Sequence, residues 1–123
     1  MRRTEQKDAI HKSLLSAGRP LSAQEVLELA QVAVPGLGIA TVYRQLKALV
    51  RDGIAIPVEL AGEASRYELA DREHHHHFRC TACGRVFDVP GCPGTIGARV
   101  PEGFVVEDHE VILYGRCKGC ASG

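Results

Sequence analysis

Hydrophobic residues recur every three or four positions through the first part of the chain, which is the spacing of amphipathic helices. The pattern predicts a helix over residues 5–16, with Ile10 and Leu14 on its apolar face. A second helix is predicted to open at Ser22, because Ser22 and Glu25 form a capping-box pair. Its inward positions are Ala23, Val26, Leu27 and Ala30.

A third helix is predicted over residues 39–52, and Gly53 is expected to stop it. Its buried stripe consists of Ile39, Val42, Leu46, Leu49 and Val50. Arg44, Lys47 and Arg51 lie three and four residues apart on the other side. Such a basic face is typical of a helix that reads DNA, but also of one that only meets solvent.

Two strand-like segments follow over residues 54–60 and 65–69, joined by a turn. Three helices and a hairpin in this order predict a winged helix-turn-helix over residues 1–70. Polar composition around residues 70–73 marks a hinge, and residues 71–123 form a second domain. Strand-like runs in that domain cover residues 85–89, 104–107 and 110–114. The predicted fold class is α+β, a winged helix-turn-helix followed by a small α/β domain.

With 123 residues the chain is short, and small domains often rely on bound metal or a partner chain for stability. A net charge of zero argues against nonspecific nucleic-acid binding. However, residues 1–51 hold eight Lys or Arg against four Asp or Glu, which is compatible with DNA binding by the first half. There is no long apolar run or export signal, so we expect no membrane partner and a cytoplasmic location.

Four of the five cysteines form two C-x-x-C pairs, Cys80 with Cys83 and Cys117 with Cys120. In a cytosolic protein, paired cysteines are more often metal ligands than disulfides. Four thiolates suit structural zinc in a closed tetrahedral shell. The 33 residues between the pairs mean that such a site would tie the end of the chain to the start of the second domain. A redox disulfide and unrelated thiols are the alternatives.

A run of four histidines, from His74 to His77, lies just before Cys80. In an extended segment side chains alternate, so His74 and His76 would face one way and His75 and His77 the other. One run could therefore supply imidazole donors to two metal sites. An affinity tag and a solvated loop are the alternatives, although tags usually sit at chain termini.

Several segments resemble, in the expected order, the ferric uptake regulator (Fur) family of metal-dependent transcriptional repressors, whose zinc-sensing branch is one candidate. Residues 38–46, GIATVYRQL, resemble the recognition helix of the family. Residues 66–69, followed by the histidine run and residues 78–84, resemble the passage into its second domain. Residues 109–117 resemble its late strand before the second cysteine pair.

The resemblance implies a homodimer that binds a double-stranded DNA operator and becomes a repressor when metal fixes the hinge. Tyr43 and Arg44 would touch bases and backbone in the major groove. Arg2 and Arg3 would reach neighbouring phosphates or the minor groove. The further DNA-contact candidates are Thr41, Lys47 and Arg51.

The resemblance also implies two regulatory metal sites beside the cysteine site, with the second domain serving for dimerisation. The ligands implied at the hinge are Glu68, His75 and His77. The ligands implied in the dimerisation domain are His74, His76 and His109. Cys92, the one unpaired cysteine, stands where the family commonly has a carboxylate, and is either a fourth ligand or a buried apolar thiol.

The chain departs from the family in the loop before the second helix, which often supplies another hinge ligand. Arg19 and Pro20 stand there, and neither binds metal. Peroxide sensing by iron-catalysed oxidation is therefore not expected. Water, Glu63 or Glu59 would then complete the hinge site.

Three imidazoles and the Cys92 thiolate form a softer donor set than histidines with a carboxylate, which favours zinc over iron or manganese as the regulatory metal. Iron and manganese remain the alternatives. A zinc enzyme would need an open coordination position and a Glu base, and the H-x-E and P-C-x-x-C pattern of deaminases is absent. A metal-buffering protein would need the histidines but not the winged helix. We therefore expect a repressor of metal-homeostasis genes, not an enzyme.

Overall fold

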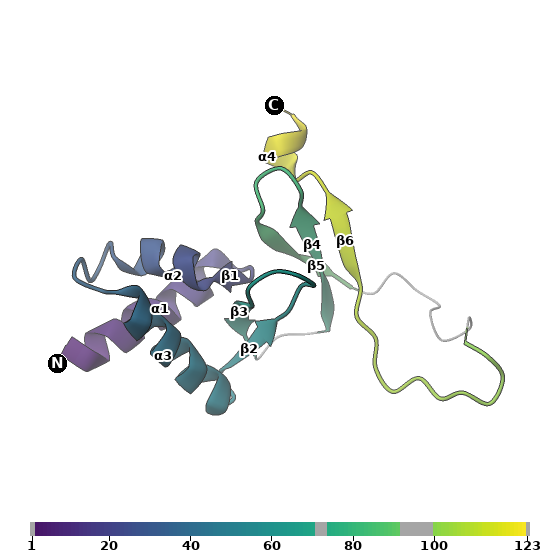
Figure 1. The fold of residues 1–123 in the computed structure, drawn as a ribbon, viewed down its shortest axis with the longest axis horizontal. Coiled ribbons are helices and arrows are strands. Elements are labelled where there is room, and N and C mark those ends of the chain that lie inside the picture. Colours follow the sequence, from purple (N-terminus) through teal and green to yellow (C-terminus); the bar gives the residue numbers. More distant parts are fainter. Residues whose placement is uncertain (1, 71–73, 92–99, 123) are drawn as a thin grey trace. The chain divides into compact units, whose positions relative to one another are not determined.

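The computed structural model describes residues 2–70, 74–91 and 100–122, and the chain divides into two compact units, Met1–Arg72 and Glu73–Gly123. The elements of the first unit are α1 (Arg2–Ala17), β1 (Leu21–Ser22), α2 (Ala23–Ala30), α3 (Ile39–Arg51), β2 (Ala55–Val58) and β3 (Arg66–Leu69) (Figure 1). Those of the second are β4 (His75–Cys80), β5 (Val86–Pro90), β6 (Ile112–Gly115) and α4 (Lys118–Ala121). Across the described ranges no helix has the length and apolar character needed to cross a membrane.

The three helices of the first unit enclose one hydrophobic core. Its fully buried members include Ile10, Leu14, Leu21, Val26, Val42, Leu46 and Leu49. The capping box that opens α2 is present, because the Ser22 hydroxyl accepts the Glu25 amide at 3.1 Å and the Glu25 carboxylate accepts the Ser22 amide at 3.0 Å. Gly53 ends α3 with a φ of 76°, a left-handed conformation that glycine adopts without strain.

A three-stranded sheet in the order β1-β3-β2 completes the first unit. The β2 and β3 strands form an antiparallel hairpin directly after α3, with Pro57 opposite Tyr67. The two-residue β1, which was not predicted, pairs with the other edge of β3. The prediction that Ile39 joins the buried stripe is wrong, because Ile39 is the first residue of α3 and is 39% exposed.

The second unit is built on a sheet in the order β5-β4-β6 (Figure 1). Three of the four histidines in the run form the first half of the central strand β4, which is antiparallel to β5 and parallel to β6. The register places His77 opposite Asp88 on one side and Ile112 on the other. Each neighbouring strand therefore places one residue directly beside His77 in the sheet, Asp88 from β5 and Ile112 from β6.

The prediction of a strand over residues 104–107 is wrong. Residues 104–111 have no strand structure, and Phe104 and Val105 are 68% and 84% exposed. The apolar triplet follows a turn at Gly103 and precedes the polar residues 107–110, so it lacks the alternation that would bury one face of a strand. The last strand is Ile112–Gly115, two residues later than its predicted start.

Candidate metal centres and nucleic-acid surface

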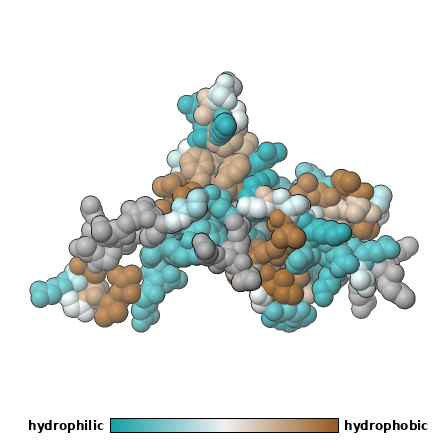
Figure 2. Space-filling model, turned by 180° about the vertical axis from the view of Figure 1, so that it is seen from behind, coloured by the Kyte–Doolittle hydropathy of each residue, from teal (hydrophilic) through white to brown (hydrophobic). Residues whose placement is uncertain are grey.

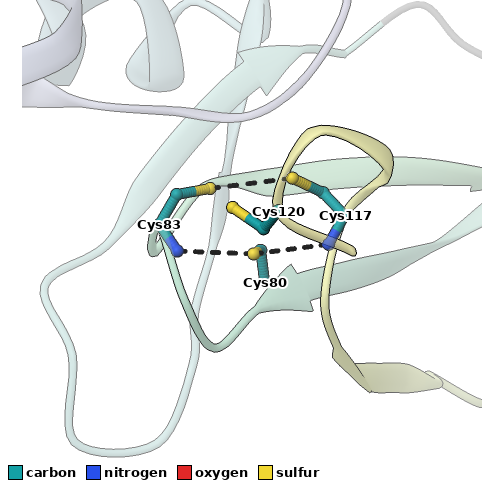
Figure 3. Close-up of side chains that lie close together, drawn as sticks. All are labelled: Cys80, Cys83, Cys117 and Cys120. Carbon is teal, nitrogen blue, oxygen red and sulfur yellow. Dashed lines mark hydrogen bonds between the residues drawn. The ribbon is translucent and has the colours of Figure 1, made fainter. Parts of the chain in front are cut away.

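Two knuckles from distant parts of the second unit bring four cysteines together (Figure 3). Cys80 ends β4, Cys83 follows in the turn, Cys117 caps α4 and Cys120 lies within it. The four cysteine sulfurs all lie within 4.8 Å of one another, and the Cys83 and Cys117 sulfurs are 3.9 Å apart. A tetrahedral zinc shell with Zn–S bonds of about 2.3 Å spaces its sulfurs by about 3.8 Å. The donor set and its spacing therefore fit structural zinc.

The backbone of both knuckles favours ionisation at one of these cysteines. The Cys80 sulfur accepts the amides of Cys83 and Cys117, each at 3.4 Å, and these bonds lower the pKa of the Cys80 thiol to about 5 (Figure 3). Hydrogen bonds with Cys117 and Cys80, together with burial, raise the pKa of Cys120 to about 12. Without a cation, one thiolate thus suppresses ionisation of its neighbour, and a bound metal would allow all four to ligate.

Three histidines converge on one side of β4. The His74 Nε2 atom lies 3.2 Å from His76 Nε2 and 3.2 Å from His109 Nε2, and His109 comes from the segment before β6. A tetrahedral shell with Zn–N bonds of about 2.0–2.1 Å spaces its nitrogens by about 3.3 Å. Glu107 and Asp108 line the surface pocket beside His74 and His109. The structure therefore brings together all three imidazoles that the resemblance implies.

His76 is the buried member of this group, with 1% of its surface exposed. Burial, and then the neighbouring His74 and His109, lower the pKa of His76 and keep its ring neutral near neutral pH, the form that binds metal. The Val111 amide donates to His76 Nδ1 at 3.2 Å, so the neutral ring carries its proton on Nε2. A cation at Nε2 would require this proton to lie on Nδ1 instead, so the hydrogen bond from the Val111 amide would have to give way.

A second donor group lies on the other side of β4. His75 Nε2 and His77 Nε2 lie 3.5 and 3.7 Å from one carboxylate oxygen of Asp88, whose side chain is only 12% exposed. Together the three groups offer two imidazole nitrogens and a carboxylate oxygen, which would make a His-His-carboxylate donor set for a metal ion. The sequence reasoning missed Asp88. The signal that could have found it is the pairing of β4 with β5, which sets Asp88 opposite His77.

Glu68 is a carboxylate of β3 in the first unit and is 1% exposed, an unusual burial for an acidic residue. The alternatives proposed for completing the hinge site have other partners in the first unit. Glu63 accepts from Arg66 at 3.0 Å, and Glu59 accepts from Ser65 at 3.2 Å. Cys92 lies outside the described residues.

The exposed face of α3 carries the expected side chains. Tyr43, Arg44, Lys47 and Arg51 are all exposed, while Val42, Leu46 and Leu49 are buried beneath them. The Arg44 guanidinium donates to the Thr41 hydroxyl at 2.9 Å. Arg2 and Arg3 begin α1, but their side chains lie outside the described part of the structure.

Comparison with known proteins shows the family. The model of the ferric uptake regulator family matches residues 1–114. A ferric uptake regulation protein of Bordetella parapertussis is 34% identical over 108 residues, which cover 85% of this chain and 78% of the relative. The chain therefore belongs to the ferric uptake regulator family, whose members are metal-responsive transcriptional regulators and not enzymes.

Solved structures agree with this assignment. The structure of a ferric uptake regulator from Francisella tularensis with iron has a TM-score of 0.73 and 30% identity, covering 94% of this chain and 91% of that one. A zinc-bound manganese uptake regulator has a TM-score of 0.75 and 28% identity, covering 95% and 91%. Relatives are thus named for different metals, and membership of the family does not select one of them.

Proposed function

We propose that this protein is a zinc-responsive transcriptional repressor of metal-homeostasis genes that binds a DNA operator as a homodimer in the cytoplasm. The observation that carries the proposal is the pair of donor groups that converge at the two faces of β4, three imidazoles at one face and His75, His77 and Asp88 at the other. A regulator needs a metal site whose occupancy changes with supply.

The first unit supplies the DNA-binding part of the proposal. Helices α2 and α3 followed by the β2–β3 hairpin have the order of a winged helix-turn-helix, in which the later helix enters the major groove. Tyr43 and Arg44 are the base and backbone contacts proposed for α3. Lys47 and Arg51 add positive charge along the same exposed face, with Thr41 beside Arg44.

The proposed switch uses the group around Asp88. We propose that Glu68 joins His75, His77 and Asp88 when metal binds, as the family resemblance implies for three of these positions. Metal would then bind the DNA-competent arrangement of the two units more tightly than other arrangements, which is sufficient to shift the population toward it. Imidazole and carboxylate ligands both suit zinc.

The second regulatory site would hold zinc through His74, His76 and His109, with Cys92 as the proposed fourth ligand. Three imidazoles favour zinc over manganese, which prefers oxygen ligands. Iron or manganese is the second candidate effector, and the Asp88 carboxylate is the observation that favours it.

The homodimer is proposed to form through the second unit. Its sheet ends at β6, and Leu113 and Tyr114 on this strand are 46% and 59% exposed. Phe104 and Val105 stand exposed on the segment before it, and Figure 2 shows a small hydrophobic patch flanked by hydrophilic atoms at the left of the view. Exposed apolar side chains beside an open strand edge are typical of a surface that another chain covers.

Replacement of Tyr43 or Arg44 with Ala tests the reading helix. The duplexes are first selected from a randomised library with zinc-loaded wild-type protein. Each variant should bind the selected duplexes more weakly, with a loss of about 1–3 kcal/mol in binding free energy measured by fluorescence anisotropy. Lys12→Ala, which removes a charge from the exposed face of α1, is the control and should bind as the wild type does. Unchanged affinity in both α3 variants would mean that another surface reads the DNA.

A further inference from the structure

Arg79 lies beside the cysteine site but belongs to none of the donor groups described above. It precedes Cys80 on β4, and its guanidinium donates to the Cys80 carbonyl at 3.0 Å. The same guanidinium lies over Gly84, where a Cβ atom would be 3.9 Å from Arg79 Nη2. The side chain therefore folds along the backbone of the first knuckle instead of extending into solvent.

The Cys80 carbonyl accepts the hydrogen bonds that close the turn of that knuckle. It also accepts the Gly84 amide at 2.9 Å, while the Cys80 amide donates to the Arg85 carbonyl at 2.9 Å. Gly84 has a φ of 77°, so the turn is completed by a left-handed residue. Arg79 thus adds a charged donor to the acceptor that fixes the backbone of a cysteine ligand.

The charge around the knuckles has one sign. Residues 78–87 and 111–123 contain no acidic residue, and their cations are Arg79, Arg85, Arg116 and Lys118. Three of these, Arg85, Arg116 and Lys118, are exposed, whereas Arg79 is half-buried. Zinc with four thiolates carries a net charge of −2, and a cation sheltered from water offsets such a charge more effectively than an exposed one.

We propose that Arg79 is a positioning residue for the structural zinc, which it stabilises by holding the Cys80 backbone and by offsetting the charge of the four thiolates. The inference rests on the zinc assigned to the four cysteines. It concerns how long the metal stays bound, because partners of ligands commonly change metal affinity by 10–100-fold.

The test compares zinc release from purified full-length variants in excess chelator at neutral pH. Arg79→Met keeps the apolar stem of the side chain but removes the donor and the charge, and zinc release should accelerate about tenfold. Arg79→Lys, which restores the charge, should recover part of the wild-type rate. Arg116→Met is the matched control, because it removes an exposed charge one residue before Cys117, and it should stay within about twofold of the wild type.

The sulfur-to-metal charge-transfer band of cobalt-loaded protein gives a second readout. Arg79→Met should shift or broaden this band, since the Cys80 sulfur moves when its backbone is released, whereas a residue that only packs the sheet would leave it unchanged. Arg79→Gln, which keeps a neutral donor, should show a smaller acceleration of release than Arg79→Met. If Arg79→Met does not fold, the release rate of Arg79→Gln is compared with that of the wild type instead.

The outcomes separate the inference from the assignment on which it rests. Wild-type protein that holds no zinc at its cysteines would overturn both. Zinc-bound wild type with unchanged release from Arg79→Met would overturn the role of Arg79 alone. Equal acceleration in Arg79→Met and Arg116→Met would show that only overall charge matters, and would overturn the positioning role.

Discussion

At the scale of single residues, Asp88 would decide the chemistry of the metal site proposed around His75 and His77. Two imidazoles alone form a soft and incomplete donor pair, and the Asp88 carboxylate adds a harder anionic donor 3.5–3.7 Å from both rings. It also adds the negative charge that attracts a divalent cation. The proposed site would therefore depend on a residue from β5 as much as on the histidine run.

Asp88→Asn keeps the size of the side chain but removes its charge. We expect affinity for the regulatory metal to fall by about tenfold or more, with the cysteine site unaffected, because the amide is a weaker ligand. Calorimetric titration of protein whose cysteine site is already filled measures this. Asp8→Asn makes the same change on the exposed face of α1 and should titrate as the wild type does. Equal affinities for Asp88→Asn and wild type would remove Asp88 from the site.

The histidines could be predicted from the sequence and Asp88 could not, for a physical reason. Alternation along one strand follows from the geometry of extended backbone, so the grouping of His74 with His76 needs no knowledge of the fold. The partner of His77 depends on the register between β4 and β5, which is set by packing and turn geometry across the sheet. His109 was implied only by the family resemblance, since 32 residues separate it from His76.

At the scale of elements, β4 shows how the chain fixes the direction of functional side chains, and α2 shows how it fixes the start of a helix. Strand β4 is held between β5 and β6, so its histidines have fixed directions. Helix α2 begins at a reciprocal cap between Ser22 and Glu25, and Arg19 adds an ion pair to Glu25 at 3.0 Å. These bonds, and first of all the Ser22 amide, lower the pKa of Glu25 against the opposing effect of burial.

Ser22→Ala removes one half of this cap. The variant should lose about 1 kcal/mol in the free energy of unfolding, because the Glu25 amide loses its acceptor. Urea unfolding followed by circular dichroism measures the loss. Ser16→Ala removes an exposed hydroxyl that bonds within α1, at 2.8 Å to the Lys12 carbonyl, and should change stability much less. A loss in Ser16→Ala as large as that in Ser22→Ala would show that the cap adds nothing.

The elements that were predicted well are those with a local signal. The apolar repeat and the capping box of residues 22–25 place α2 and α3 without reference to the rest of the fold. The strand predicted over residues 104–107 rested on apolar composition alone, and Phe104 and Val105 have no strand partner among the described residues. The short β1 depends wholly on its pairing with β3, which no local pattern announces.

At the scale of the whole molecule, the apolar surface of the second unit calls for a second copy of the chain. Val105→Asp places a charge in that surface and should convert the dimer to a monomer that keeps its structural zinc. Analytical ultracentrifugation with metal analysis measures both. Val32→Asp introduces the same charge at a valine of the first unit that is 86% exposed, and should remain dimeric. A Val105→Asp variant that sediments as the wild type does would place the dimer interface elsewhere.

Metal-dependent DNA binding is the central claim, and one titration tests it most directly. The anisotropy of a selected duplex is measured with protein whose cysteine site is filled, across buffered free zinc, iron(II) and manganese(II). We expect zinc to raise the affinity for the selected duplex about tenfold or more, with no such rise for His77→Ala. Affinity that is the same with zinc and with chelator, or a His77→Ala variant that responds as the wild type does, would contradict the proposed switch. A response to iron(II) or manganese(II) but not to zinc would support the proposed switch but contradict zinc as its metal.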